Sequence, residues 1–434
     1  MPKVSIIVPV YNVAEYLRRC LDSCVCQTLA DTEVIVVNDC SPDHRDEEII
    51  RDYERDYPDK IRVFRHEKNL GLGEARNTAI RNAQGEFLLF CDSDDFLDFT
   101  ACEKMYFSAK RNDADLVVCD FYYMRDGVIG MRHVNDGIDT VERSYRPCVL
   151  NKTTVWVMLL KKSVIVDNNL FSPFRFGEDN ITMLWYLAAK KIAKVDEPLY
   201  YYVYRNSSLI GAMTSKSAEE MADVYLKVLQ YDYFSSITTE AKLSICFLIF
   251  KRFFGYWLDV LLKDPETEFT GFFKRILEIN SVVDNYRQDV LRFNNIDWEM
   301  LRANKIIDFA ESHIKEADFN AQFRKFYSEL DQQLICSALM KLKQRLTSKN
   351  VVLWASGSYG KIFTECLTMI GIEFEVSDLV AKGSTYKHWD LLKDSADIVI
   401  VSSTEFVPQV KKIFGDTEMI VLQKYLNESL RGEI

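Results

Sequence analysis

Short apolar runs alternate with polar stretches of helical period over the first part of the chain. Strand-like runs lie at Val4 to Val8, Glu33 to Val37, Ile61 to Phe64, Glu86 to Cys91 and Asp115 to Phe121. Amphipathic stretches of helical period separate these runs. Because strands that alternate with helices are typical of a mostly parallel sheet with crossover helices, the pattern predicts an α/β fold.

The pattern changes twice further along. Long aromatic-rich helical stretches fill the sequence from about Ser217 to Asn350, and strand and helix signals alternate again from Val351. We therefore expect an α/β domain, a helical region and a small Rossmann-like α/β domain, with the bounds 1–215, 216–347 and 348–434.

The last of these stretches resembles half of a dinucleotide-binding fold. Gly357 and Gly360 form part of a glycine-rich turn, and Asp378 stands where a ribose-binding acid is common, but Ala355 replaces the first glycine of the motif. We expect a packing or assembly module here, and the alternative of a dinucleotide site stays open.

Two helix starts carry the pattern of a capping box. Asn12 is followed three residues later by Glu15, and Thr100 is followed by Glu103. In a capping box the first side chain accepts a bond from the helix backbone and the acid bonds back. The sequence predicts that helices begin at these two positions.

The composition excludes some classes of function. The net charge of −11 argues against a nucleic-acid-binding protein, which needs a basic surface. The 11 cysteines show no disulfide-like spacing, so we expect a reducing, cytoplasmic compartment. The apolar run at the start is too short for a secretory signal. Lys251 and Arg252 interrupt the apolar stretch from Leu243 to Leu262, which predicts a core helix in place of a membrane span.

Carboxylates gather directly after the apolar run that ends at Cys91. Asp92, Asp94 and Asp95 occur within four residues, with Ser93 among them. Carboxylates this close repel one another, and a hard divalent ion such as Mg²⁺ would compensate their charge. The alternative is that Asp94 and Asp95 only start a loop.

Other strand ends carry polar groups that belong to the same edge of the predicted sheet. Tyr11 and Asn12 follow the first strand and Asp39 follows the second, so we expect them near Asp92. A ring beside a carboxylate suits a flat base such as uracil. A glycine-rich turn then opens a helix that holds Arg76, and backbone N–H groups with a guanidinium favour a diphosphate.

Four motifs, "SIIVPVYN", "VVNDCSPD", "NLGLGEARNTAI" and "FCDSDD", resemble in order and spacing those of the family 2 inverting glycosyltransferases of the GT-A fold. The resemblance covers roughly the first 215 residues. It implies that Asp39 contacts the base, Asp92 the ribose and Asp94 the metal ion, Mn²⁺ or Mg²⁺. Asn38 and Cys40 stand where Asp and Gly are common in the family, which leaves the selectivity for the base open. The expected donor-binding residues are Pro9, Tyr11, Asn12, Asp39, Arg76, Asp92, Ser93 and Arg205.

A second acidic pair precedes an amphipathic helix in "RFGEDNITMLWYLAAKK". The family resemblance implies that Asp179 is the catalytic base that takes the proton from the acceptor hydroxyl. Asp179 could instead cap the helix, and Glu178 could cap or orient. Arg205, in "LYYYVYRNSSLIG", is the candidate that reaches the diphosphate, although this segment could also be a strand with ordinary packing.

The resemblance implies a nucleotide-sugar donor, with a UDP-sugar favoured, and a saccharide or lipid-linked acceptor in surface polysaccharide synthesis. A peripheral contact at the inner face of the membrane and a homo-oligomer stay open, as do the sugar, the nucleotide and the linkage. Two alternatives are a sugar-phosphate nucleotidyltransferase and a non-catalytic nucleotide-sugar-binding scaffold. The first is expected to have a glycine-rich loop with Arg and Lys after the first strand, which "PVYNVAEYL" lacks.

Overall fold

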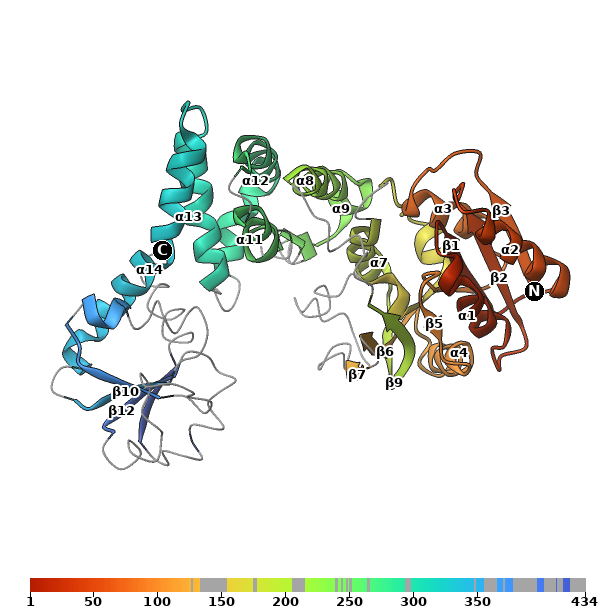
Figure 1. The fold of residues 1–434 in the computed structure, drawn as a ribbon, viewed down its shortest axis with the longest axis horizontal. Coiled ribbons are helices and arrows are strands. Elements are labelled where there is room, and N and C mark those ends of the chain that lie inside the picture. Colours follow the sequence, from red (N-terminus) through yellow and green to blue (C-terminus); the bar gives the residue numbers. More distant parts are fainter. Residues whose placement is uncertain are drawn as a thin grey trace. The chain divides into compact units, whose positions relative to one another are not determined.

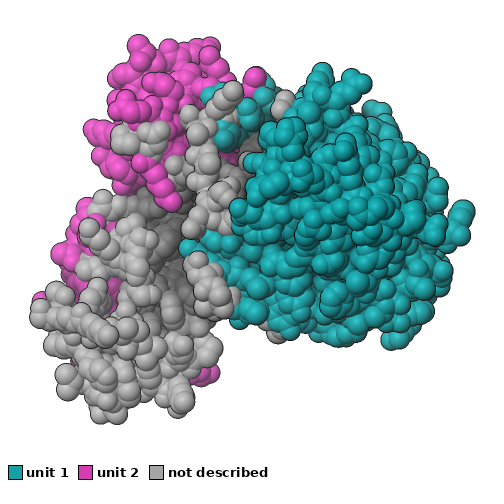
Figure 2. Space-filling model, turned by 45° about the vertical axis from the view of Figure 1, so that its right-hand side comes forward, with its two compact units in different colours: residues 1–249, 278–286 teal, residues 250–277, 287–434 magenta. Residues whose placement is uncertain are grey.

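The chain divides into two compact units, residues 1–249 with 278–286 and residues 250–277 with 287–434 (Figure 2). The computed structural model describes residues 1–125, 128–132, 154–174, 178–204, 215–238, 241–242, 245–246, 249, 252–263, 266–292, 298–346, 349–354, 365–369, 371–377, 396–401, 411 and 417–421. The domain bounds expected from the sequence stay predictions.

The first unit begins with regular alternation of strands and helices (Figure 1). In chain order its elements up to residue 132 are β1 (Val4–Val10), α1 (Ala14–Val25), β2 (Thr32–Asn38), α2 (His44–Asp56), β3 (Ile61–Arg65), α3 (Leu72–Asn82), β4 (Phe87–Phe90), β5 (Phe96–Leu97), α4 (Ala101–Asn112), β6 (Leu116–Arg125) and β7 (Val128–Arg132). The five strands expected from the sequence are confirmed as β1, β2, β3, β4 and β6.

The remaining elements of this unit bring the chain back across the same sheet. They are η1 (Val155–Val157), β8 (Met158–Lys161), α6 (Lys162–Val166), η2 (Glu178–Ile181), α7 (Thr182–Ala188), β9 (Ile192–Val203), α8 (Ser215–Leu229) and α9 (Asp232–Ser236). Of these, β8 and β9 carry the sheet beyond β4, and η2 packs against α3 and α8.

One sheet organises the first unit. Its strands follow the order β3-β2-β1-β4-β8-β6-β9-β5, and β7 pairs with β6. The strands β3, β2, β1 and β4 are mutually parallel, whereas β8 runs antiparallel between β4 and β6. Every residue of β1, β2 and β4 is buried, as expected for parallel strands that are covered on both faces. The α/β fold with a mostly parallel sheet is confirmed.

Neither expected capping box forms. Helix α1 begins after Val13 without a side-chain cap, because Asn12 has a left-handed φ of 56°. The N–H of Val13 donates instead to the buried carboxylate of Asp46 in α2. At α4, Thr100 makes no capping bond and its hydroxyl donates to Asp98. The positions of the helix starts were predicted correctly, but the expected hydrogen bonds between the capping side chains and the helix backbone do not form.

The second unit combines helices with a small parallel sheet. After the π-helical turn η4 (Phe253–Trp257), its elements are α11 (Leu258–Leu262), α12 (Phe269–Arg292, partly in the first unit), α13 (Trp298–His313), α14 (Phe319–Leu346), β10 (Val351–Trp354), β11 (Phe374–Ser377), β12 (Ile398–Val401) and β13 (Glu418–Val421). The strands pair in the order β11-β10-β12-β13, all parallel. The helical region and the small sheet are as expected, and β13 is a strand that the sequence analysis missed.

Phenylalanines form the core of the helical part of this unit. The ring centroids of Phe269 and Phe323 lie 5.0 Å apart, and those of Phe273 and Phe323 lie 4.7 Å apart. All three residues are fully buried. In the stretch from Leu243 to Leu262, the described residues Phe253, Phe254 and Trp257 are also buried. Among the described helices none has the length and apolar character needed to cross a bilayer. Gly357, Gly360 and Asp378 lie outside the described residues.

Candidate nucleotide-sugar site at the edge of the parallel strands

The carboxyl ends of β2, β1 and β4 lie side by side, because these strands are neighbours and parallel. Tyr11 follows β1 with 47% of its surface exposed, whereas Pro9 is buried within the strand, opposite Val37. Asn12 is exposed, and its backbone N–H donates to the hydroxyl of Ser41 at 2.6 Å. The structure thus brings together the strand ends that the sequence analysis selected.

Asp39 is bonded to the chain itself. Its side chain is 3% exposed, and Oδ1 lies 2.6 Å from Nδ1 of His66. The backbone N–H groups of Leu70 and Gly71 each donate to the carboxylate at 2.8 Å. Gly71 has a φ of 92°, which glycine adopts without strain, and it immediately precedes α3. In this structure Asp39 holds the loop that starts α3, and contact with a base stays a prediction.

Arg76 and Asp92 form an ion pair. Arg76 lies on α3 with a side chain that is 5% exposed, and its Nη2 donates to Oδ1 of Asp92 at 2.7 Å. The Asp92 side chain is 24% exposed. The two residues, which the sequence analysis assigned separately to the diphosphate and the ribose, therefore belong to one cluster. A carboxylate fixed by a guanidinium keeps further lone pairs for a ligand.

Asp92 to Asp95 form a tight turn. The N–H of Asp95 donates to the carbonyl of Asp92 at 3.0 Å, with Ser93 and Asp94 between them. Ser93 is buried and Asp94 is half-buried. Nη2 of Arg19, on α1, donates to the carbonyl of Asp94 at 3.3 Å. The turn places two carboxylates, those of Asp92 and Asp94, in positions that are partly open.

The turn has the donor chemistry of a hard metal site. Burial raises the pKa of Asp95 well above its usual range, and the neighbouring charges of Asp94 and Asp92 raise it further. The same negative field would favour a bound cation. Carboxylate oxygens are the ligands that Mg²⁺ and related ions prefer, so Asp94 and its surroundings fit such an ion.

Cysteine thiols pack beneath this turn. Sγ atoms of Cys20, Cys24 and Cys91 lie within 4.8 Å of one another, and all three residues are fully buried. Burial raises the pKa of Cys91 well above the ordinary value of a thiol. Because all three side chains are buried in the core beneath an acidic turn, we interpret the cluster as packing groups that fill the core.

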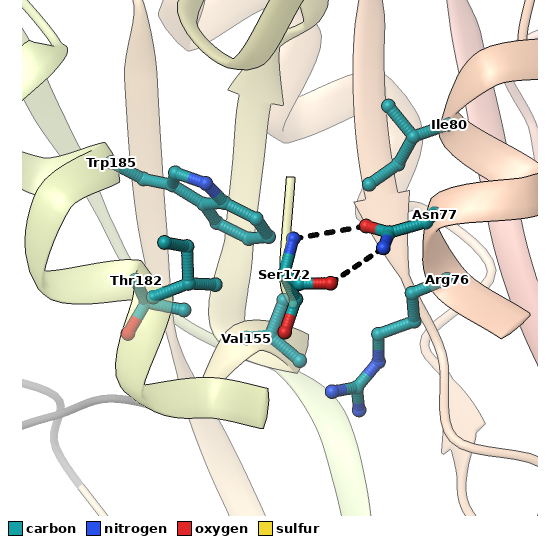
Figure 3. Close-up of a pocket in the computed structure, with 8 residues that line it drawn as sticks. Arg76, Asn77, Ile80, Val155, Ser172, Thr182 and Trp185 are labelled. Atoms are coloured by element: carbon teal, nitrogen blue, oxygen red, sulfur yellow. Dashed lines mark hydrogen bonds between the residues drawn. The ribbon is translucent and has the colours of Figure 1, made fainter. Parts of the chain in front are cut away.

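The segment that carries Asp179 lies beside Arg76. Ile181, at the end of η2, and Thr182 line a small cavity together with Arg76, Asn77, Ile80, Val155, Ser172 and Trp185 (Figure 3). Asn77 exchanges two hydrogen bonds with the backbone of Ser172, at 2.6 and 3.0 Å, which ties α3 to a residue that precedes η2 in the chain. The cavity, about 10 Å³, has room for about one water molecule and is no donor pocket.

For Glu178 and Asp179 the structure gives only the position of the backbone. Glu178 and Asp179 belong to the backbone of η2, and their side chains lie outside what the structure describes. Arg205 lies outside the described residues as well, one residue after Tyr204. Their roles stay predictions.

Comparison with known proteins identifies the family. Residues 5–158 match the family described as Glycosyl transferase family 2. The putative glycosyltransferase EpsH of Bacillus subtilis (strain 168) is 30% identical over 236 residues, which are 52% of this chain and 67% of EpsH. The chain belongs to glycosyl transferase family 2.

The similarity to family 2 proteins extends beyond the motifs. The poly(ribitol-phosphate) beta-glucosyltransferase of Bacillus spizizenii is 26% identical over 366 residues, 79% of this chain and 56% of that protein. Among solved structures, residues 1–349 of S. aureus TarS in complex with UDP-GlcNAc superimpose with a TM-score of 0.62 at 20% identity, covering 76% of this chain and 92% of that one. The latter similarity confirms the GT-A fold. The chain spans 33% to 63% of the length of three curated relatives.

Sequence reasoning missed three residues that shape the site of this family 2 protein. His66 bonds Asp39 and also, through Nε2, the hydroxyl of Thr78 at 2.9 Å. Asp95, read as part of the metal-binding cluster or as the start of a loop, is 1% exposed and bonds to β9. Tyr200, for which the sequence analysis offered ordinary packing as one alternative, donates its hydroxyl hydrogen to Asp95 at 2.7 Å. The only signal for this pair was that an acid-rich turn and an aromatic strand occur in the same domain.

Proposed function

We propose that this chain transfers a sugar from a nucleotide diphosphate donor to a hydroxyl of a saccharide or lipid-linked saccharide, with inversion at the anomeric carbon. The observation that carries the proposal is the cluster of Arg76, Asp92 and Asp94 at the edge of β1, β2 and β4, beside the segment that holds Asp179. Family membership supports the reaction type.

We assign each residue of the cluster a role. Asp92, held by Arg76, accepts hydrogen bonds from the ribose of the donor. Asp94 holds a divalent ion, Mn²⁺ or Mg²⁺, which would neutralise charge on the departing diphosphate when it is bound. Arg205 contacts the diphosphate. Asp179 takes the proton from the acceptor hydroxyl as it attacks from the face opposite the diphosphate.

A UDP-sugar is the donor we favour, because TarS was solved in complex with UDP-GlcNAc and shares this fold. The acceptor class follows from the relatives, one of which is named for a poly(ribitol-phosphate) substrate. We place the reaction in the cytoplasm, at the inner face of the membrane where the acceptor is lipid-linked. The cysteine content without disulfide-like spacing supports a reducing compartment.

The test separates catalysis from helix capping at Asp179. Asp179→Asn keeps the size and most of the capping ability, but it cannot accept the proton. We expect unchanged binding of Mn²⁺ and UDP, an unchanged melting temperature, and a loss of sugar transfer of about 10²- to 10⁴-fold. UDP release from a panel of UDP-sugars, with and without candidate acceptors, measures the transfer.

Glu178→Gln is the matched control and should retain activity. If Glu178→Gln is inactive and Asp179→Asn is active, the base is the neighbouring residue while the reaction class stands. If neither wild type nor variants release UDP or bind any nucleotide sugar, the proposed function is wrong.

A further inference from the structure

Both ends of the Asp92–Asp95 turn are bonded to one hydroxyl group. The N–H of Asp92 donates to Oη of Tyr200 at 3.1 Å. That hydroxyl donates its hydrogen to Oδ2 of Asp95 at 2.7 Å, and the N–H of Asp95 donates back to the carbonyl of Asp92. The three bonds close a ring through the turn. Two of the bonds have backbone N–H donors, so the single hydrogen of the hydroxyl is left to donate to the carboxylate.

Asp95 has a second bond to the same strand. The N–H of Val203 donates to Oδ1 of Asp95 at 2.7 Å, so both carboxylate oxygens accept a hydrogen from β9. A carboxylate accepts from two donors without offering a hydrogen of its own, whereas an amide of the same size presents an NH₂ group to one of them. This position therefore needs a side chain with two acceptor oxygens, which Asp supplies and Asn does not.

Tyr200 itself has little freedom to move. Its ring is fully buried and stacks on Trp156 at a centroid distance of 4.5 Å. Its backbone pairs with Leu97 of β5, immediately after the turn. The adjacent residues reinforce this pairing, because the rings of Phe96 and Tyr201 stack at 4.4 Å with an angle of 7°. Because Tyr200 is held in the sheet, its hydroxyl fixes the turn relative to the sheet.

We propose that Asp95 and Tyr200 are positioning residues that fix the spacing between the carboxylates of Asp92 and Asp94, and thereby set the affinity for the divalent ion and the nucleotide. This inference rests on the proposed function, since it assigns the metal ion to Asp94. Neither residue touches the donor in this assignment. They act through the conformation of the turn.

The test is Tyr200→Phe in the full-length chain, which removes one oxygen atom and leaves the stacked ring in place. We expect the dissociation constant of Mn²⁺ in the presence of UDP to rise about tenfold, because the N–H of Asp92 loses its acceptor and the turn gains freedom. The signal of free Mn²⁺ in electron paramagnetic resonance measures this constant without any acceptor substrate. Asp95→Asn is the second variant and should raise it similarly.

Two tyrosines provide matched controls. Tyr53→Phe removes a hydroxyl that bonds the carbonyl of Arg18 and the carboxylate of Asp22, at 3.0 and 2.6 Å. It should lower the melting temperature at least as much as Tyr200→Phe, yet change the Mn²⁺ constant less than about twofold. Tyr186→Phe removes a buried hydroxyl that bonds no described group, and it should change neither quantity.

The outcomes separate the inference from the proposed function. In a first outcome, wild type binds Mn²⁺ with UDP, and the variants Tyr200→Phe and Asp95→Asn bind Mn²⁺ as tightly as the control Tyr53→Phe. The positioning role is then wrong, and the proposed function stands. If both variants lose cooperative melting, the pair serves folding and the inference is overturned. If wild type itself binds no Mn²⁺ with UDP, metal dependence fails and the inference fails with it.

Discussion

Two acidic strand ends flank β1, and the chain uses them differently. Asp39 follows β2 and is 3% exposed, with its carboxylate bonded to the His66 ring and to two backbone N–H groups. Asp92 follows β4 and is 24% exposed, with Arg76 as a side-chain partner. The position after a parallel strand predicts where carboxylates gather. The number of donors that the chain supplies decides which of them anchors a loop.

The difference also links the two ends. Asp39 holds the loop before α3, and α3 carries Arg76 toward Asp92. Asp39 therefore helps to place Arg76 beside Asp92, because it holds the start of the helix that carries Arg76. The cluster at Asp92 needs a cation or donors from a ligand, because three carboxylates lie within four residues and repel one another. Burial, and then the charges of Asp94 and Asp92, raise the pKa of Asp95.

The largest effect on activity is expected in the partly exposed turn after β4, at Asp94. Asp94→Asn should lower sugar transfer by about 10³-fold, or about 4 kcal/mol, because an amide holds a divalent ion weakly. Donor binding should lose its dependence on Mn²⁺, while urea unfolding stays unchanged. Titration of UDP with and without Mn²⁺ measures the dependence. Mn²⁺-dependent UDP binding at the wild-type level would show that Asp94 is no ligand.

The next effect is expected at the residue that joins the two ends. Arg76→Lys keeps the charge but loses the planar fork that bonds Asp92, so the affinity for UDP should fall about tenfold. The free energy of unfolding should fall by about 1–2 kcal/mol, since a buried pair is disturbed. Isothermal titration of UDP and urea unfolding measure the two changes.

Arg81→Lys is the control on the same helix. Arg81 is half exposed and bonds Glu74 at 2.6 Å, so its replacement should change stability by less than about 1 kcal/mol and UDP affinity not at all. Equal effects of the two substitutions would contradict the role of Arg76 at the site.

At Asp39, whose carboxylate is bonded to the protein itself, we expect the main effect on the free energy of unfolding. Asp39→Asn presents an NH₂ group to donors that need an acceptor, so we expect a loss of about 1–3 kcal/mol in urea unfolding. The transfer rate at saturating donor should stay within about threefold of wild type. Asp43→Asn, at the N-cap of α2, is the control and should cost little, because Asn is an equally good cap. A loss of UDP affinity larger than the loss in stability would assign Asp39 to the base after all.

Local sequence patterns predicted the parallel half of the sheet well. The runs from Val4, Glu33, Ile61 and Glu86 are apolar and bounded by polar residues, and each forms a strand within a few residues of the expected limits. The antiparallel strand β8, from Met158 to Lys161, was not predicted. It lies between β4 and β6 through pairing with residues 40 or more positions away, which local periodicity does not encode.

The site was predictable to the level of its residues, but its bonds were not. The motifs selected Asp92 and Arg76, which form an ion pair, yet the partner of Asp95 lies 105 positions later at Tyr200. Asn12 was expected to cap α1, but its positive φ turns it away and Asp46 bonds the helix start. Such contacts depend on how elements pack, so a single sequence does not reveal them.

The smallest effect is expected at Tyr11, between the two acidic ends. If Asp39 stays bonded to His66 and to the loop before α3, its carboxylate does not bind the base. The exposed ring of Tyr11, at the end of β1, is then the surface on which the base can stack. Tyr11→Ala should then weaken UDP binding by about 1 kcal/mol, or about fivefold, and leave the melting temperature of the unliganded protein unchanged. Tyr57→Ala, at an exposed tyrosine after α2, should not affect UDP. Unchanged UDP affinity in Tyr11→Ala, together with a loss in Asp39→Asn, would reverse the roles of the open ring and the closed carboxylate in binding the base.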